Sequence, residues 1–374
     1  MTAPGAWRDR FEVPDHGLLY LDGNSLGRPP KAALTAASQA ADAWSQRLIR
    51  GWNDGWYELP LAIGDKIGRL LGARSGEVAV ADSTTVNLHR LATAAVRLAP
   101  GRIVTDDLNF PSDLHALAAV AKAQGVELEV IPSDAINGPV EALEAALDDG
   151  AGLLSLSGTA FHSGFTYDID RLTRSAHRAG TLTLWDLSHT AGAVPVDLAS
   201  ADVDLAVGCT YKYLNGGPGS PAWQYVRSDL QTRLGNPLPG WMGHAEPFAF
   251  DGRHQPAAGA RGFLTGTPPI LSLAPIEAGV DLLLEAGMED VRACSLQLTD
   301  RLLQWFDDEL ERRGMGLASP RDPAVRGGHL TLTHPEGLAV DLALLDAGVI
   351  PDFRPPDGIR FGPSPLYTTL DEVD

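Results

Sequence analysis

The sequence predicts an α/β protein, with a mainly parallel sheet flanked by helices in a large domain and a small α+β domain beside it. Two observations predict this fold class. Between about residues 78 and 207, short apolar runs alternate with longer amphipathic runs, which is typical of strands joined by helical crossovers. After about residue 262 this alternation stops and a long helical pattern begins. The 374 residues allow about two domains.

The elements of the large domain follow from apolar runs and helical spacing. Continuous apolar runs of this length are typical of strands that are buried on both faces of a sheet. The strands are expected at residues 78–81, 102–105, 128–131, 152–156, 182–185 and 205–207. Helices with apolar residues on one face are expected at 86–98, 114–124 and 169–179.

The small domain is expected in the last third of the chain. The segment Thr267-Pro268-Pro269 interrupts the pattern. The elements expected after it are a helical segment over 271–314, a strand at 329–333, a helix at 338–347 and a strand at 359–361. The domain boundaries that we predict are 1–50 for an N-terminal segment that contributes to the small domain, 51–262 for the large domain and 263–374 for the small domain. The chain stops where a helix begins, so the end of the small domain is expected to be shortened.

The composition excludes several classes of protein. The 48 acidic and 29 basic residues give a net charge of −19, which argues against nucleic acid as a partner. Two cysteines cannot build a disulfide scaffold or a four-cysteine zinc site, and no metal site is predicted. No apolar run is long enough for a membrane span, and the charged N-terminus does not resemble a signal peptide. We therefore expect a cytoplasmic protein.

The segment 185–223 carries the most informative chemical pattern. A strand ends in Asp186, at the sheet edge where open α/β sheets bind ligands, and His189 follows on the same turn. A second strand leads to Lys212, one of only four lysines, and a glycine-rich turn follows at 216–219. A lysine amine that forms a Schiff base and a carboxylate that pairs with a ring nitrogen suit pyridoxal phosphate. The alternative is a surface lysine and a helix-capping aspartate.

Two further segments lie between an expected strand and an expected helix. At 82–88, the helix N-terminus could bind a phosphate, or Ser83 or Thr84 could simply cap the helix. At 109–113, Phe110 could stack on an aromatic ring and Asp113 could accept a hydrogen bond. The alternative is a core phenylalanine and an N-cap.

Three segments farther along the chain are less specific by themselves. The glycine-rich loops at 239–244 and 262–269 carry single aromatic and hydroxyl side chains, and without context they are packing loops. Arg360, at the start of a strand, could bind a substrate carboxylate through two parallel hydrogen bonds. A surface salt bridge is the more common role for an arginine.

Eight motifs together resemble those of the kynureninases, which are pyridoxal-phosphate enzymes of the aspartate aminotransferase fold type, fold type I. The resemblance covers residues 20–367 in order. The motifs are YLDGNSLGRPP (20–30), STTVNLH (83–89), NFPSD (109–113), DLSHTAG (186–192), TYKYLNGGPG (210–219), GWMGH (240–244), FLTGTPP (263–269) and RFGPSPLY (360–367).

The resemblance implies roles for individual residues. Lys212 resembles the Schiff-base lysine that also moves protons, Asp186 the partner of the pyridinium nitrogen, and Tyr211 a phosphate ligand with a part in proton transfer. The cofactor-binding residues implied are Thr84, Thr85, Phe110, Ser112, Asp113, Asp186, His189, Tyr211, Lys212, Trp241 and Thr267. The substrate-binding residues implied are Arg360 as the α-carboxylate clamp, Asn24 and Ser25 in the first motif, and Trp52 and Trp56 near the aryl ring.

The resemblance also implies an assembly and a reaction. Trp241 and Thr267 resemble residues that reach the phosphate of the neighbouring subunit, so a homodimer with shared active sites is expected. Some members of the family carry serine and asparagine at the positions of Gly266 and Thr267. The implied reaction is hydrolysis of L-kynurenine or 3-hydroxykynurenine to L-alanine and an anthranilate, in tryptophan catabolism and NAD biosynthesis.

Two alternatives stay open at the level of sequence. One is another fold-type-I lyase, such as a cysteine desulfurase or an epimerase. A desulfurase needs a reactive cysteine on a mobile loop, and neither Cys209, beside Lys212, nor Cys294, in an expected helix, suits that task. The other alternative is an inactive paralogue that only binds pyridoxal phosphate.

Overall fold

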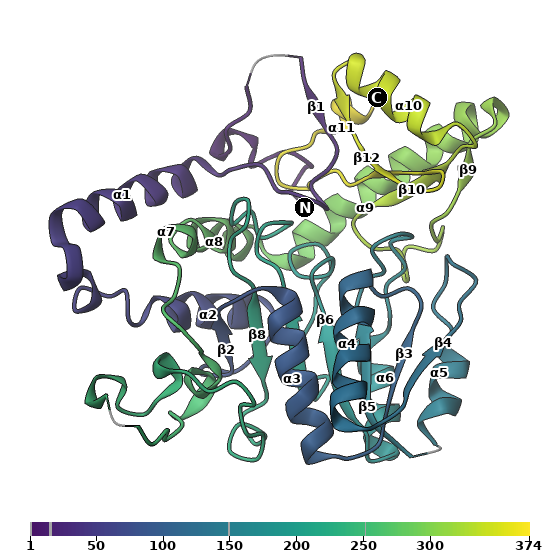
Figure 1. Cartoon of the computed structure of the whole chain (residues 1–374). Helices are drawn as coiled ribbons and strands as arrows, with labels where there is room; N and C mark the ends of the chain where they lie inside the picture. The colour runs from purple at the N-terminus through teal and green to yellow at the C-terminus, as the bar shows by residue number, and fades with distance from the viewer. Residues whose placement is uncertain (1, 15–16, 149, 251) are drawn as a thin grey trace.

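The computed structural model describes residues 2–14, 17–148, 150–250 and 252–374. The chain forms a large α/β unit with a smaller unit packed against the carboxyl ends of its strands (Figure 1). Among the described residues, none of the helices combines the length and the apolar character that crossing a bilayer requires.

The large unit is built on a seven-stranded sheet in the order β2-β8-β7-β6-β5-β3-β4. Six of these strands run parallel to one another, and β8 is antiparallel to both of its neighbours. The strands are β2 (Val78–Val80), β3 (Arg102–Asp106), β4 (Leu128–Ile131), β5 (Ala151–Ser157), β6 (Leu182–Asp186), β7 (Leu205–Gly208) and β8 (Trp223–Val226). This arrangement confirms the mainly parallel sheet.

Helices cover both faces of this sheet (Figure 1). On one face lie α3 (Thr84–Leu98) and α4 (Pro111–Gln124), which pack against each other and on the sheet. On the other face lie α2 (Leu59–Leu70), α5 (Val140–Leu147), α6 (Ile169–Arg178), α7 (Ile270–Leu273) and α8 (Ile276–Ala286). Long α1 (Lys31–Arg47) contacts α7 and α8.

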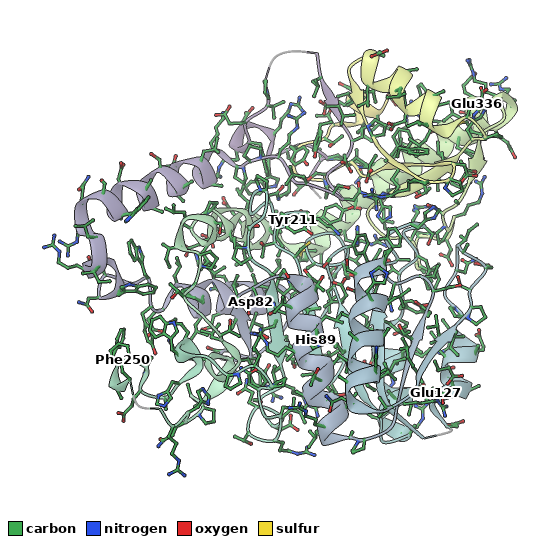
Figure 2. All side chains as sticks on the ribbon, in the orientation of Figure 1. Asp82, His89, Glu127, Tyr211, Phe250 and Glu336 are labelled. Atoms are coloured by element: carbon green, nitrogen blue, oxygen red, sulfur yellow. The ribbon has the colours of Figure 1, made fainter. Side chains whose placement is uncertain are left out.

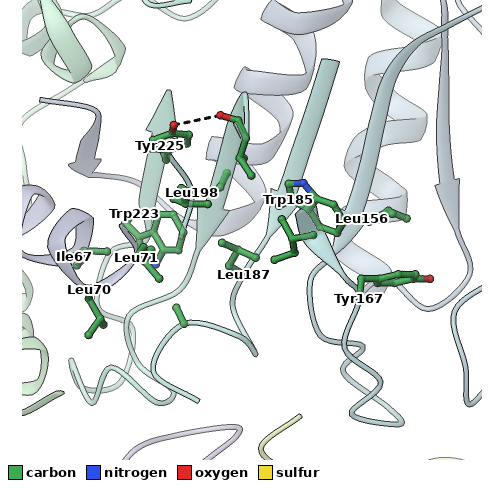
Figure 3. Packing of buried hydrophobic residues seen from close by; sticks show 14 of the residues in the cluster. Ile67, Leu70, Leu71, Leu156, Tyr167, Trp185, Leu187, Leu198, Trp223 and Tyr225 are labelled. Carbon is green, nitrogen blue, oxygen red and sulfur yellow. Dashed lines mark hydrogen bonds between the residues drawn. The ribbon is translucent and has the colours of Figure 1, made fainter. Parts of the chain in front are cut away.

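Alternation along the strands explains the two layers. Leu153 and Leu184 point into the core beneath α3 and α4, whereas their neighbours Leu154 and Trp185 point into the core on the other face. Figure 3 shows part of this second core, in which Trp185 and Trp223 are the largest side chains. Because both faces are buried, the strands carry apolar residues at successive positions, and this produced the continuous apolar runs in the sequence.

The small unit contains a four-stranded antiparallel sheet in the order β12-β13-β10-β9 and the long helix α9 (Met288–Trp305). Its strands are β9 (Gly316–Leu317), β10 (Leu330–Thr333), β12 (Asp352–Arg354) and β13 (Gly358–Phe361). The remaining elements are β1 (Leu19–Tyr20), which pairs in parallel with β11 (Val349–Ile350), and the helices α10 (Gly337–Asp346) and α11 (Leu370–Val373). The first residues of the chain therefore join the small unit through the pairing of β1 with β11.

Short helical turns complete the chain. The 3₁₀ turns are η1 (Arg8–Arg10), η2 (Leu48–Trp52), η3 (Trp241–Gly243), η4 (Pro247–Ala249), η5 (Gly259–Phe263) and η7 (Glu311–Arg313), and η6 (Phe306–Leu310) is a π-helical turn.

Two details differ from the sequence-based expectation. The segment 271–314 is not one helix, because Gly287, at φ 79°, ends α8 and separates it from α9. Strand β8 was not predicted. Its sequence WQYV is short, and its place between β2 and β7 depends on pairing with strands that lie 15 or more residues away in the chain.

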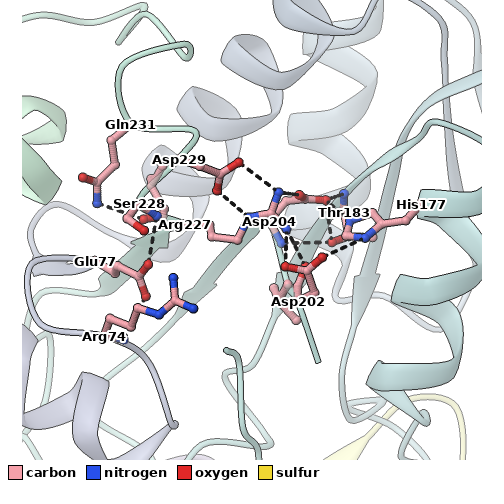
Figure 4. A network of polar contacts seen from close by, with 12 residues as sticks. Arg74, Glu77, His177, Thr183, Asp202, Asp204, Arg227, Ser228, Asp229 and Gln231 are labelled. Atoms are coloured by element: carbon pink, nitrogen blue, oxygen red, sulfur yellow. Dashed lines mark hydrogen bonds and ion pairs between the residues drawn. The ribbon is translucent and has the colours of Figure 1, made fainter. Parts of the chain in front are cut away.

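A buried polar network closes the end of the sheet where β7 begins (Figure 4). The fully buried carboxylate of Asp204 accepts hydrogen bonds from His177 Nε2 at 2.9 Å and from the backbone N–H of Thr183 at 2.8 Å, and it pairs with Arg227 at 3.0 Å. The bond to Asp204 raises the pKa of His177. Every oxygen of this buried charge thus faces a donor or a cation, which offsets its desolvation.

The N-terminal segment is held tightly against the loop that carries Lys212. The backbone N–H of Gly27 donates to the carbonyl of Tyr211 at 2.8 Å. A Cβ on Gly27 would clash with the carbonyl oxygen of Lys212 and with the side chain of Asn215. Only glycine permits this close approach between the two segments.

We therefore expect Gly27→Ala to lower the free energy of unfolding by about 2 kcal/mol, since an added methyl must push a backbone carbonyl aside. Chemical denaturation measures this change. Gly235→Ala is the matched control, because a Cβ there meets no atom within 4 Å. Equal stability of both variants would show that the segment is not clamped on this loop.

Candidate active site

A cavity of about 410 Å³ lies between the carboxyl ends of the large sheet and the small unit. Two of its residues, Asp82 and Tyr211, are labelled in Figure 2 near this boundary. The lining residues are Ser25, Asp82, Ser83, Thr84, Thr85, Phe110, Ser112, Asp113, Asp186, Ser188, His189, Tyr211, Lys212, Gly219, Ser220, Ala222, Arg354 and Arg360. Four of the lining segments (82–85, 110–113, 186–189 and 211–222) end or follow parallel strands, whose carboxyl ends lie at one edge of the sheet. Ser25 comes from the N-terminal segment, and Arg354 and Arg360 come from the small unit.

The amine of Lys212 is held beside an imidazole. Its Nζ lies 3.1 Å from Nε2 of His189 and 6.0 Å from the centre of the Phe110 ring. Burial lowers the pKa of Lys212, and burial followed by the charge of Lys212 places the pKa of His189 well below its usual value. The imidazole is therefore neutral and can accept a hydrogen bond from the amine.

Two carboxyl groups stand in the same cavity. Asp186 ends β6 and accepts the backbone N–H of Ser188 at 2.8 Å. Asp113, in the first turn of α4, is buried, and within the described part of the chain its Oδ2 has no hydrogen-bond partner. Burial, and then the charge of Asp186, raises the pKa of Asp113 well above its usual value. The pair thus favours a state in which Asp113 holds a proton.

The N-terminus of α3 forms a site suited to an anion. Ser83 caps this helix by accepting the N–H of Val86 at 3.4 Å, while Thr84 and Thr85 occupy its first turn. Asp82 precedes the helix at φ 53° and is held by Arg90 at 2.9 Å and by Thr265 at 3.1 Å. The free N–H groups of the first turn and the nearby hydroxyls can hold a phosphate.

Asn109 positions the Phe110 ring. Its side-chain amide donates to the hydroxyl of Thr105 and to the carbonyl of Ser155, and its oxygen accepts the N–H of Ser157. The turn is thereby fixed to β3 and β5. The Phe110 ring, 41% exposed, contacts Phe161 edge to face at 5.2 Å and leaves one side towards the cavity.

Arg360 lies on β13 and reaches the cavity from the small unit. Its Nη1 donates to the carbonyl of Phe161 at 2.6 Å, and its Nη2 donates to Ser25 Oγ at 2.9 Å and pairs with Asp352. Ser25, from the N-terminal segment, donates to Asp352 at 2.7 Å. The guanidinium is fully buried, so its orientation is fixed by these partners.

The structure brings most of the predicted residues to this cavity. Those that line it are Ser25, Thr84, Thr85, Phe110, Ser112, Asp113, Asp186, His189, Tyr211, Lys212 and Arg360. Those outside its lining are Asn24, Trp52, Trp56, Trp241 and Thr267.

The residues outside the lining have other neighbours within this chain. Asn24 is buried next to Gly362, and Thr267 lies in a separate small cavity near Thr265. Trp52 contacts Trp56 at 5.8 Å and Trp241 at 6.0 Å between ring centres. The roles given to these five residues stay predictions.

Sequence analysis did not single out Ser188, Ser220 or Arg354 as site residues. Ser188 and Ser220 lie close to Asp186 and Lys212 in the chain, so proximity was a usable signal. The sequence carries a stronger signal for Arg354. The segment Pro355-Pro356-Asp357-Gly358 is typical of a turn, and a hairpin at this turn places Arg354 near Arg360.

Comparison with known proteins decides the family. The chain is 43% identical, over 376 residues, to the kynureninase of Pseudomonas fluorescens, with 98% of this chain and 89% of that protein covered. This chain belongs to the kynureninase family. The family model described as the kynureninase C-terminal domain matches residues 291–374.

Solved structures with low sequence identity share the fold. A cysteine desulfurase from Thermococcus onnurineus has a TM-score of 0.86 at 19% identity and covers all of this chain and 96% of its own. A variant of the enzyme C-DES, with glycine covalently linked to its pyridoxal-phosphate cofactor, has a TM-score of 0.84 at 17% identity, with coverage of 96% and 97%. The predicted fold-type-I architecture is thereby confirmed.

The Asn109 contacts generate a prediction. We expect Asn109→Ala to lower the free energy of unfolding by about 3 kcal/mol, because it leaves the buried N–H of Ser157 without this partner and removes the hydrogen bonds from the amide to Thr105 and Ser155. Urea denaturation measures this change. Asn236→Ala, which removes two hydrogen bonds at a half-buried loop position, is the control and should cost about 1 kcal/mol. A smaller loss at Asn109 than at Asn236 would contradict the positioning role.

Proposed function

We propose that this protein hydrolyses L-kynurenine or 3-hydroxykynurenine to L-alanine and anthranilate or 3-hydroxyanthranilate, in tryptophan catabolism, with pyridoxal phosphate as its cofactor. The observation that carries the proposal is the meeting, in one cavity, of the amine of Lys212, the carboxyl pair of Asp113 and Asp186 and the N-terminus of α3. The membership of the kynureninase family selects the substrate among the reactions that such a site supports.

The residues present fit the cofactor. Pyridoxal phosphate, when bound, supplies an aldehyde that links to amines and a ring that withdraws electrons from the carbon beside the linked nitrogen. Lys212 would be the amine that links to the aldehyde, and the N-terminus of α3 would hold the phosphate. The Phe110 ring would pack against the ring of the cofactor. Asp186 would accept a hydrogen bond from the protonated ring nitrogen, and the protonated Asp113 beside it would donate into the same site, which accounts for its unpaired oxygen.

Lys212 is suited to move protons during the reaction. A protonated lysine cannot take a proton from the substrate, and burial favours the neutral amine by lowering its pKa. His189, itself neutral, accepts a hydrogen bond from Nζ and holds the amine in place without adding a competing charge. Tyr211 lines the same wall, and the neighbouring thiol of Cys209 and burial raise its pKa, so its hydroxyl stays protonated and can donate.

The two ends of the substrate meet different parts of the site. Arg360 binds the α-carboxylate, since its fixed, buried guanidinium offers charged donors at the cavity wall. The aryl ring of the substrate needs apolar walls. Trp52, Trp56 and Trp241 form an aromatic cluster that could supply such walls, and they lie outside the cavity of a single chain.

We propose that a second copy of the chain brings these residues to the site. Around the tryptophan cluster, large apolar side chains lie on the surface: Phe248 is 56% exposed, Phe250 81% and Ile49 76%. Such a concentration of exposed apolar surface is typical of an interface. A homodimer in which Trp241 and Thr267 complete the neighbour's site accounts for both observations.

Both cysteines are free thiols, which suits a cytoplasmic enzyme.

The cysteines also argue against desulfurase chemistry, despite the shared fold. Cys209 is buried, burial raises its pKa, and its thiol donates to the carbonyl of Ser188 at 3.9 Å. Cys294 is buried in α9, and its thiol donates to the carbonyl of Thr2 at 3.0 Å. A cysteine that attacks a substrate sulfur must be an accessible thiolate, and neither residue meets that requirement.

The purified protein with pyridoxal phosphate should release alanine and a fluorescent anthranilate from kynurenine, and Lys212→Ala should lower this rate by about 10³-fold or more. Anthranilate fluorescence and amino-acid analysis measure the two products. Lys122→Ala, at an exposed position on α4, is the control and should keep the wild-type rate. Release of sulfide from cysteine, with no anthranilate from kynurenine, would contradict the proposal.

Mixed dimers test whether the sites are shared. Lys212→Ala and Trp241→Ala are each expected to be poorly active alone. If Trp241 serves the neighbour's site, a hybrid dimer has one site with both residues intact, so a random mixture of the two variants should recover about a quarter of the wild-type activity. Activity is measured after the two chains are co-expressed or refolded together. A mixture no more active than the sum of its parts would place Trp241 in its own chain's site.

A further inference from the structure

A hairpin of the small unit presents three charged side chains to one region. In the β12–β13 pair, Asp352 lies directly opposite Arg360, and Arg354 is two residues farther along the strand, on the same face as Asp352. Arg354 and Arg360 both line the cavity. One of these arginines has the carboxylate role described above, whereas Arg354 has none so far.

The carboxylate of Asp352 connects the two arginines. Its Oδ2 pairs with Arg354 Nη2 at 2.8 Å and with Arg360 Nη2, and it accepts the hydroxyl of Ser25 at 2.7 Å. Three donors thus meet at one oxygen. This arrangement holds the guanidinium groups of Arg354 and Arg360 beside each other despite their like charges.

The guanidinium groups of Arg354 and Arg360 each have an Nε–H donor without a hydrogen-bond acceptor among the described residues. Within the described residues, the Nε atoms of Arg354 and Arg360 are buried and have no hydrogen-bond partner. Leaving a charged donor unpaired away from water is costly, so an acceptor is expected there when the site is in use. The acceptor must serve two guanidinium groups, and a carboxylate has two oxygens with which to do so.

The charges point to the same ligand. A single arginine paired with Asp352 would leave no net charge to attract an anion. Arg354 and Arg360 together carry two positive charges against the one negative charge of Asp352. Burial, followed by the charge of Asp352, raises the pKa of the nearby Asp22 to about 7, so positive charge remains at the cavity wall. After burial and the charge of Lys212, the further causes that lower the pKa of His189 include Arg360 and Arg354, so their positive potential extends into the cavity.

We propose that Arg354 is a second binding residue for the α-carboxylate of the substrate, and that Asp352 positions both arginines for it. The inference rests on the proposed function, in that the ligand is an amino acid. Arg360 supplies the buried, fixed contact. Arg354, whose side chain is 35% exposed, supplies the excess positive charge and a contact at the mouth of the cavity.

The test separates the carboxylate from the rest of the ligand. L-alanine and L-alaninamide have nearly the same shape, but only alanine carries a carboxylate. Each is titrated into the pyridoxal-phosphate-loaded protein, and the change in cofactor absorbance gives a dissociation constant. For Arg354→Gln we expect the constant for alanine to rise about tenfold or more, and that for alaninamide to change less than twofold. Arg354→Lys should fall between wild type and Arg354→Gln for alanine, since it keeps the charge and loses the planar fork.

A matched variant controls for a general effect of removing an arginine. Arg321→Gln, on the small unit, removes a side chain that is 53% exposed and pairs with Asp307, and should leave both constants unchanged. A parallel rise for alanine and alaninamide in Arg354→Gln would mean that Arg354 only shapes the site, and no rise in either would mean that it does not contact the ligand. Both outcomes would overturn the proposal. Kynurenine turnover by the wild type is measured separately, so that a failure of the proposed function is distinguished from a failure of the second clamp.

Discussion

The function of this fold depends on one amine, that of Lys212, which is held at the edge of the sheet beside a neutral imidazole. Lys212 has His189 as its hydrogen-bond partner at 3.1 Å, and burial lowers its pKa. Strands β6 and β7 are parallel neighbours, so the loop after each begins at the same edge, and this brings His189 and Lys212 together. The backbone hydrogen bond from the N–H of Gly27 to the carbonyl of Tyr211 also holds the loop that carries Lys212. A partly desolvated amine therefore results from the topology of the sheet.

In the described part of the chain, some of the buried polar atoms without partners belong to residues that line this cavity, namely Asp113, Arg354 and Arg360. Among the described residues, buried side-chain atoms without hydrogen-bond partners include those of Asp22, Asn24, Asp113, Tyr213, His329 and Arg360. Several of these residues contact the cavity or the segments that enclose it. An unpaired buried polar group costs about 1–3 kcal/mol. The core clusters on both faces of the sheet are apolar and continuous, so the fold can carry this cost at one edge. A bound group that pairs with these atoms would remove part of this cost.

The sequence predicted what depends on local pattern. The strands from residue 102 to 207, the turn residues Asp186 and Lys212, and the helix N-terminus at Thr84 follow from apolar periodicity and from residue type at strand ends, and the structure has them where they were expected. Strand β8 and the break at Gly287 were missed because long-range pairing and a positive φ value decide them. Arg354 was missed because its function depends on the register of a hairpin. Trp52 and Trp241 lie outside the cavity lining, and no local pattern in the sequence indicates where they pack.

The arrangement of charges suggests why the small unit and the N-terminal segment belong to the site. Lys212, from the large unit, and Arg354 and Arg360, from the small unit, line the same cavity. In the proposed function the amino end of a substrate would bind at the cofactor held by Lys212, and its carboxylate would bind at the two arginines. The distance between the two ends of an amino acid is fixed, so a correct substrate must satisfy both units at once. The N-terminal segment connects the two units. Ser25 accepts a hydrogen bond from Arg360 and donates one to Asp352, both in the small unit. Gly27, two residues later, donates a backbone hydrogen bond to Tyr211 in the loop that carries Lys212. A shift of the small unit would therefore move the carboxylate contact relative to the amine, and selectivity for α-amino acids depends on how the two units are held together.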